Sequence, residues 1–209
     1  MAEVVTKGVG KVERTADRAE VQASFETVGS TRNEAVERLT ARIAAVEPAL
    51  ERPGVEVRSR QLNVHDNWDG KRRSGSRAVQ NYVLRVDDLA ELDGLLGALV
   101  TAEPTWLNGP AWQLKEDVEA VREAQREAVR DARRRAEGYA EALGVRLGPL
   151  LRLTDGDAEG WAVESSHRIR VAAAYGGSPG VPPQMDQLGL EAQQITVTVR
   201  CTASWTLLD

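Results

Sequence analysis

The stretch from Ala124 to Gly148 decides the fold, because it predicts a long helix that ends in a turn and leads into a strand. It reads AQREAVRDARRRAEGYAEALGVRLG. Alanines recur at every fourth position from Ala120 to Ala140, and small side chains allow a helix to lie close to a sheet or another helix. The helix predicted over 116–143 would be about 40 Å long. Each step of four residues advances about 400°, so we expect the alanine stripe to drift around the helix.

Alternating side chains predict strands near both ends of the chain. The clearest runs from Ile195 to Leu207, where apolar residues alternate with threonine, serine and arginine. Val4 to Val12 is a β-rich segment whose Gly8 and Gly10 suggest a bulge or a close backbone approach. A second alternating run, Ala19 to Glu26, follows a short turn. We therefore expect the two N-terminal strands to form a hairpin.

Two shorter helices are predicted between these strands and the long helix. Thr31 and Glu34 form a capping box, and an apolar stripe continues to Val46. Pro48 disfavours the helical conformation of the preceding residue, so we expect this helix to end or kink there. Leucines at helical spacing, after Asp88, predict the second helix over 88–99.

Further strands surround the second helix. Between Val55 and Val64 the apolar residues change from odd to even positions, which implies a bulge or twist between Arg58 and Gln61. A polar loop over 69–77 leads to the returning strand around Leu84. A Trp-rich strand over 105–114 contains Pro110, which favours an edge position or a bulge.

The element order ββ-α-ββ-α-β-α-β(β)-β lacks strict βαβ alternation, so we predict an α+β fold with mostly antiparallel sheet. It has two shorter helices and one long helix. Two strands are predicted between the long helix and the last strand, one at 145–154 and one around His167 to Val171. We expect residues 1–209 to form one domain, either undivided or as two subdomains, with a flexible Pro/Gly segment at 176–183.

Composition excludes several classes of protein. The 209 residues are 42% hydrophobic and 28% charged, which is typical of globular proteins. No apolar run is long enough to span a membrane as a helix. The first seven residues show no secretory signal, which favours a cytoplasmic location. A net charge of −5 argues against a surface that binds nucleic acid throughout.

Candidate catalytic and metal sites are weak. His65 and His167 lie far apart without a metal-ligand spacing, and the adjacent Asp66 would point to the opposite face of a strand. The single cysteine, Cys201, lies at one of the alternate positions of the last strand that are apolar, so it is expected to be buried. No nucleophile motif or complete phosphate-binding glycine motif is present. We therefore predict no catalytic residue, metal or cofactor, while an enzyme with an unrecognised site stays an alternative.

The loop over 69–77 is a candidate anion-binding site. Its four cations lie near Trp68 and Tyr82, and such a cluster is able to follow a phosphate backbone and stack a base. They are Lys71, Arg72, Arg73 and Arg77. A solvated hairpin tip is the preferred interpretation, because acidic residues flank the loop. Binding of nucleic acid or another anionic ligand is kept as the alternative.

Self-association is predicted through Trp106 and Trp112. Both tryptophans lie on the short strand that contains Pro110, and an edge strand with two large aromatics needs a cover in a soluble protein. A second copy of the chain would supply that cover, which predicts a homo-oligomer. In the other interpretation both side chains pack beneath the long helix of the same chain.

Several segments resemble the SIMPL-domain family, also called domain of unknown function 541. Val5 to Val12 is similar to its V-x-G-x-G-x-V opening, and Leu107 to Gly109 to its I/L-N-G turn. The stretch 124–148 resembles its helix-and-strand signature, and 195–207 its closing strand. These motifs consist of glycine turns, small residues and alternating strands, so they indicate a fold and no chemistry.

The resemblance carries over no catalytic residue, and we expect a non-enzymatic role. The family includes bacterial periplasmic immunogenic proteins, an oxidative-stress defence protein and a mammalian kinase-associated adaptor, and one bacterial member assembles into a ring-like homo-oligomer. Many bacterial members carry an export signal that this chain does not show. We expect a protein of undetermined role, related to stress by resemblance, that acts through self-assembly or partner binding.

Overall fold

The computed structural model describes residues 2–156 and 190–209, and these residues form an α+β fold. The chain divides into two compact units, each with its own antiparallel sheet. The described part of unit 1 comprises residues 2–15, 116–156 and 194–209, and that of unit 2 comprises 16–115 and 190–193. The predicted strand around His167 and the Pro/Gly segment at 176–183 lie outside the described residues.

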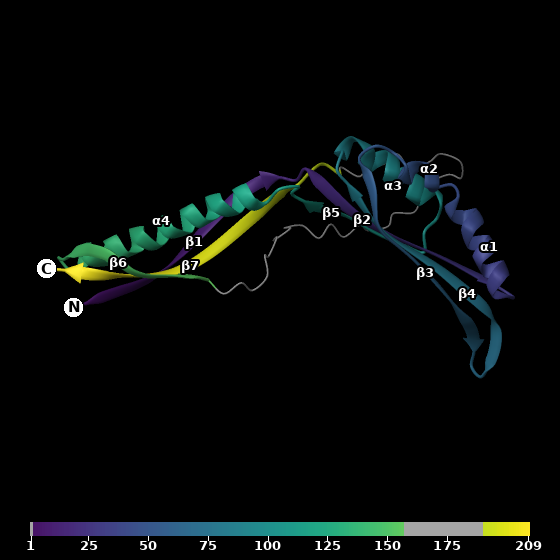
Figure 1. Ribbon diagram of the computed structural model, residues 1–209, viewed down its shortest axis with the longest axis horizontal. Helices are drawn as coiled ribbons and strands as arrows, with labels where there is room; N and C mark the ends of the chain where they lie inside the picture. The colour runs from purple at the N-terminus through teal and green to yellow at the C-terminus, as the bar shows by residue number, and fades with distance from the viewer. Residues whose placement is uncertain (1, 157–189) are drawn as a thin grey trace, which may run out of the picture. The chain divides into compact units, whose positions relative to one another are not determined.

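Unit 1 is a three-stranded sheet with one long helix. Its elements are β1 (Glu3–Thr15), α4 (Val118–Ala142), β6 (Arg146–Asp155) and β7 (Gln194–Leu208). The strand order is β1-β7-β6, and both ladders are antiparallel. Helix α4 lies along β1 and β7 (Figure 1). The predicted long helix and closing strand are thus confirmed.

Glycines of β1 allow α4 to pack unusually close. A Cβ atom on Gly8 would lie 2.8 Å from the Cβ of Ala132, and one on Gly10 would lie 2.6 Å from the backbone nitrogen of Ala128. The close backbone approach expected from these glycines is therefore confirmed. All six stripe alanines, from Ala120 to Ala140, are buried. Because their stripe drifts around α4, the strands must follow that drift, as a twisted sheet can.

The predicted N-terminal hairpin is wrong. β1 pairs with β7 along its whole length, from Glu3 opposite Thr206 to Thr15 opposite Gln194. β2 (Arg18–Gly29) belongs to the other sheet, where it pairs with β4 and β5. At positions 8 and 10 only glycine leaves room for α4 to pack this closely, and this helix contact favours the sheet in which β1 lies beneath α4.

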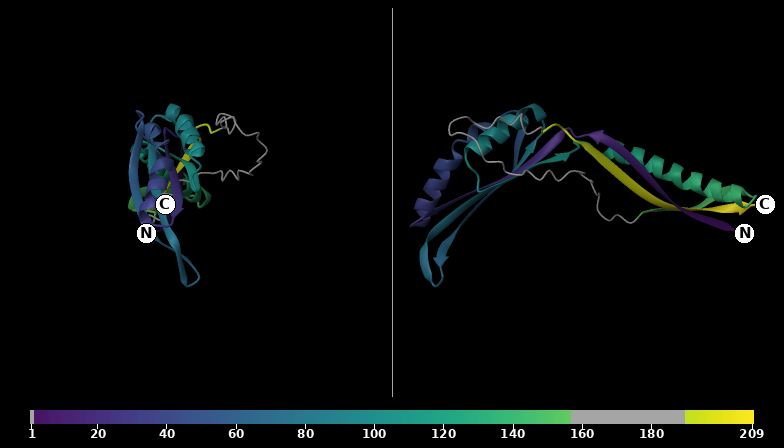
Figure 2. Two further views of the ribbon diagram at one scale, coloured as in Figure 1. Left: turned by 90° about the vertical axis from the view of Figure 1, so that its right-hand side faces the viewer. Right: turned by 180° about the vertical axis from the view of Figure 1, so that it is seen from behind.

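Unit 2 is a four-stranded antiparallel sheet with helices on one face (Figures 1 and 2). Its strand order is β3-β4-β2-β5. Besides β2, its elements are α1 (Arg32–Ile43), α2 (Glu47–Leu50), β3 (Val55–Asp69), β4 (Arg72–Val86), the 3-10 helix η1 (Leu89–Glu91), α3 (Leu92–Thr101) and β5 (Trp106–Gln113). Phe25 and Tyr82 are buried under the helices and meet edge to face.

Capping residues in the sequence correctly predicted where these helices begin. Thr31 accepts the backbone N–H of Glu34 at the start of α1, and Asp88 accepts that of Ala90 before η1. The first helix ends at Ile43 instead of at Pro48, which lies in the first turn of α2. Proline is tolerated in a first turn, because the N–H it lacks has no intrahelical partner there.

Two irregularities in the strands agree with the sequence. The ladder between β3 and β4 shifts register between Val57 and Ser59, which leaves Arg58 as the extra residue. The ladder between β2 and β5 shifts between Glu20 and Gln22, beside Pro110. β5 is also an edge strand. The predicted bulge in β3 and the edge position of the proline are both confirmed.

The predicted loop over 69–77 is mostly strand. β3 continues to Asp69 and β4 begins at Arg72, so only Gly70 and Lys71 form the turn. The pairs Asp69–Arg72 and Trp68–Arg73 extend the ladder to this tip. The run of charged and small residues suggested a loop. Because the two long strands are already paired next to it, the ladder continues through these residues despite their low strand propensity.

Candidate functional site

Acids pair with two of the four cations on the β3–β4 hairpin. Arg73 forms an ion pair with Asp66 at 3.2 Å, and Arg77 forms one with Glu26 at 2.6 Å. Arg72 lies opposite Asp69 in the ladder. Within the described residues, neither Lys71 at the turn nor Arg72 has an ion pair. The four predicted cations therefore lie on one hairpin, two of them paired with acids, and anion binding there stays a prediction.

The two tryptophans of β5 point to opposite faces of the sheet. Trp106 lies opposite Ser24 and is 50% exposed, whereas Trp112 lies opposite Ala19 and is 8% exposed. Residues 106 and 112 would share one face in a regular strand, but the bulge beside Pro110 shifts the alternation by one residue. Trp106 alone presents a large aromatic surface to solvent, and Trp112 is packed within unit 2.

An exposed apolar edge on β6 was missed by the sequence analysis. Within residues 2–156 and 190–209, β6 pairs with β7 on one side and forms an edge of its sheet. Leu150, Leu151 and Leu153 are each about half exposed. The sequence did contain a signal, because leucines stand at both odd and even positions of the predicted strand and would therefore face both sides of the sheet. A strand with leucine on both faces needs a cover on both faces, and α4 lies mainly over β1 and β7.

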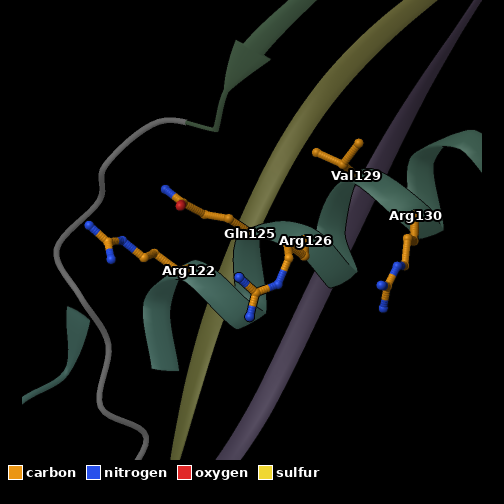
Figure 3. Close-up of a pocket in the computed structure, with 5 residues that line it drawn as sticks. All are labelled: Arg122, Gln125, Arg126, Val129 and Arg130. Carbon is orange, nitrogen blue, oxygen red and sulfur yellow. The ribbon is translucent and has the colours of Figure 1, made fainter. Parts of the chain in front are cut away.

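Helix α4 carries an open basic groove, shown in Figure 3. It has a volume of about 470 Å³ and lies along exposed positions of the helix. The residues that line it are Arg122, Gln125, Arg126, Val129 and Arg130. Arg122 pairs with Glu119 and Arg130 with Glu127, while Arg126 has no ion pair within the described part of the chain.

Two titratable groups of unit 1 hold α4 against the sheet. Asp131 on α4 accepts the backbone N–H of Val9 at 3.2 Å, and this hydrogen bond lowers the pKa of the Asp131 carboxyl, helped by Arg134 and Arg135. Cys201 is buried beside Ala128 and Ala132. Burial raises the pKa of its thiol, so the predicted buried position of Cys201 is confirmed and a reactive thiolate is disfavoured.

No group of three metal-ligating side chains gathers within residues 2–156 and 190–209. His65 is exposed on β3, and the neighbouring Asp66 pairs with Arg32 and Arg73. None of the described helices is both long and apolar enough to cross a membrane.

Comparison with known families gives one decisive match. The family model described as SIMPL, a protein of unknown function (DUF541), matches residues 4–205. The chain belongs to the SIMPL family. The match begins in β1 and ends in β7, so the SIMPL sequence pattern spans both units and includes the paired first and last strands. The SIMPL assignment establishes a family without an established role, and no curated protein matches the chain.

Proposed function

We propose that this SIMPL protein acts without catalysis, by binding protein chains, and that the first of these is a second copy of itself. The observation that carries the proposal is the apolar edge strand β6. Leu150, Leu151 and Leu153 are about half exposed there, on a strand that pairs along one edge only in the described part of the chain. An exposed apolar edge is a template for another strand, and soluble proteins usually blunt or cover it.

Other exposed apolar side chains of the described chain also gather in unit 1. Exposed apolar side chains mark interaction sites where they form a contiguous patch. Besides the β6 leucines, the exposed large apolar residues of unit 1 are Val5, Val118, Val129, Tyr139, Leu143 and Leu208. Unit 2 exposes fewer such residues, among them Leu62 and Trp106. Unit 1 is therefore the favoured interface.

A two-fold symmetric contact fits an edge strand. When two identical edges meet antiparallel about a two-fold axis, residue i of one strand meets residue j of the other and residue j meets residue i, so the same edge is used on both copies. β6–β6 pairing would continue the sheet of unit 1 and bury leucines from both copies. The β5 edge is a weaker candidate, because Pro110 lacks an N–H and Trp112 is buried. Trp106, exposed on the β5 edge of unit 2, stays a separate candidate contact.

Sedimentation equilibrium tests the proposal. At tens of micromolar we expect the full chain to sediment as a species larger than its 22.8 kDa monomer. Leu151→Lys should shift the distribution toward the monomer, because a charged edge side chain opposes strand addition. Leu62→Lys is the matched control, since Leu62 is similarly exposed on β3, an edge strand of unit 2. A wild-type chain that stays at 22.8 kDa would refute self-association. Equal weakening by both variants would refute the assignment to β6.

A further inference from the structure

One face of the sheet in unit 2 carries a row of polar side chains. The helices lie on the other face, over Phe25 and Tyr82 (Figures 1 and 2). Asn81 stands between the buried Gln80 and Tyr82 of β4, so its side chain points away from the helices. The ladders align one residue of every strand in a line across this face, in the order Gln61 on β3, Asn81 on β4, Ser24 on β2 and Trp106 on β5. We call this line the amide row, and it spans about 14 Å at the usual spacing of strands.

The side-chain amides of this face are free to bind a ligand. Gln61 is exposed and Asn81 is half-buried, and neither amide has a hydrogen-bond partner within residues 2–156 and 190–209. Asn108, exposed on β5 opposite Gln22, also has no side-chain partner in this part of the chain. An amide donates through its NH2 group and accepts through its oxygen, and a hydroxyl group also does both. The face therefore complements a ligand that carries many hydroxyl groups.

The charged residues beside the amide row pair with one another. Arg77 forms an ion pair with Glu26 at 2.6 Å on one side of the row, and Arg85 pairs with Glu56 on the other. Because these charges are compensated within the sheet, an ionic ligand would have to compete with existing ion pairs. The amides and the aromatic ring of the row are neutral, so the face matches a neutral ligand in charge.

Trp106 supplies an apolar platform at the β5 end of the row. Its side chain is 50% exposed, and its neighbour in the ladder is the small Ser24. Val79 and Val83, half-buried on either side of Asn81, add apolar surface to the same face. The C–H groups of a flat ligand pack on an aromatic ring, while polar groups at the rim of the ligand reach polar neighbours. A sugar ring has this combination of an apolar face and a hydroxylated rim.

We propose that this face of unit 2 binds a neutral oligosaccharide whose β-linked rings lie flat along the amide row. One ring stacks on Trp106, and its hydroxyl groups bond the amides of Asn81 and Asn108. The next rings continue toward Gln61 on β3. Equatorial hydroxyl groups suit this arrangement, because they lie at the rim of a ring and leave its face apolar. The site goes beyond the binding of protein chains proposed for unit 1, and its test is independent of self-association through β6.

Titration of the full chain, followed by NMR, tests the site. The probes are cellotetraose, chitotetraose and xylotetraose, all chains of β-linked rings with equatorial hydroxyl groups, each added separately to millimolar concentration. With at least one of them we expect saturable shifts of the Asn81 and Gln61 side-chain amides and of the Trp106 indole N–H. Maltotetraose is the matched control, because its α-linked glucose rings form a curved chain, and it should bind at least fivefold more weakly than the tightest probe. Added salt should change the affinity less than twofold, since no ion pair is involved.

Variants of the row test which side chains bind. Trp106→Ala should weaken the tightest probe at least tenfold, and Asn81→Ala at least fivefold. Trp68→Ala is the matched control and should change the affinity less than twofold, because Trp68 is 60% exposed on the same sheet but lies about 24 Å along β3 from Gln61. The spectrum of each variant shows whether it is folded, and Gln61→Ala replaces Asn81→Ala if that variant does not fold. Equal losses in Trp106→Ala and Trp68→Ala would overturn the assigned site.

Three further results would overturn the proposal. The absence of saturable shifts with all three probes would show that the face does not bind such a sugar. Trp106 signals that change with protein concentration alone would assign the face to a second copy of the chain. Failure of a neutral paramagnetic agent to broaden the Trp106 and Asn81 side-chain signals of the free protein at any protein concentration would show that the chain itself covers the face.

Discussion

Replacing Gly8 with alanine should open the contact between α4 and the sheet of unit 1. The added Cβ would overlap the carbonyl oxygen of Ala128 and lie 2.8 Å from the Cβ of Ala132. An ordinary van der Waals contact is at least 3.4 Å, so helix and strand would have to separate by more than half an ångström. The obstructing atoms are backbone and alanine atoms, which cannot rotate away.

The magnitude follows from the packing around the new methyl group. Inserting a methyl into a tightly packed core costs about 1–3 kcal/mol, and a backbone obstruction puts Gly8→Ala at the upper end. A separation of α4 from β1 would also weaken contacts along the alanine stripe, because the helix moves as a rigid element. We therefore expect unit 1 to open more easily by about 2–3 kcal/mol.

The single thiol of the chain reports this opening. Cys201 lies opposite Gly8 in the ladder and is buried beside Ala128 and Ala132, so a thiol reagent reaches it when α4 separates from the sheet. When closing is faster than labelling, the rate follows the opening equilibrium. A loss of 2–3 kcal/mol should then accelerate labelling about 30- to 140-fold, since 1.4 kcal/mol is a factor of ten.

Two companion variants make the test specific. Gly138→Ala lies on α4 itself, with no atom within 4 Å of the added Cβ, and should slow labelling or leave it unchanged because alanine favours a helix. Gly10→Ala meets the backbone of Ala128 but lies opposite Val199, and should accelerate labelling as Gly8→Ala does. Labelling rates in Gly8→Ala and Gly10→Ala within threefold of wild type would refute the close-packing argument.

Three further predictions concern single side chains. Asp131→Asn should destabilise unit 1 by about 1 kcal/mol near neutral pH in urea unfolding, because the charged acceptor of the Val9 N–H is lost. The lowered folded-state pKa of Asp131 means that its contribution is present above the unfolded pKa of about 3.9 and is lost as the pH falls through the folded value, so wild type and variant should converge in acid. Thr31→Ala should cost about 1 kcal/mol through its lost cap, and an unchanged urea midpoint would contradict this. Trp112→Ala should cost about 3–5 kcal/mol and Trp106→Ala less than about 1 kcal/mol, and similar losses measured for the two would refute their placement on opposite faces.

Local patterns predicted most elements of the fold but not the partner of the first strand. Alternation and capping residues mark β7, α4 and the start of α1 because neighbours in sequence determine those features. The pairing of β1 with β7 joins the two ends of the chain. The alternating pattern of a strand does not show which distant strand will pair with it. The glycines of β1 did indicate a close approach, and α4 turned out to be the element that approaches.

The candidate surfaces were harder to predict because small irregularities change which face a side chain occupies. One extra residue in the ladder beside Pro110 separates Trp106 from Trp112, although their spacing suggests a shared face. The acid Glu26 that neutralises Arg77 comes from β2, far from the hairpin in sequence. Flanking acids such as Asp66 were visible beforehand, and Asp66 does form an ion pair with Arg73.

The packing that defines unit 1 also explains its exposed edge. The glycines of β1 draw α4 toward β1 and β7, and the helix is too narrow to cover a third strand as well. Leu150 and Leu153 lie opposite Trp205 and Ala203, whose side chains pack under α4, so these leucines occupy the same face but extend beyond the helix. The close glycine–alanine contact therefore leaves β6 open, and the feature that identifies the fold also creates the surface that we propose binds other chains.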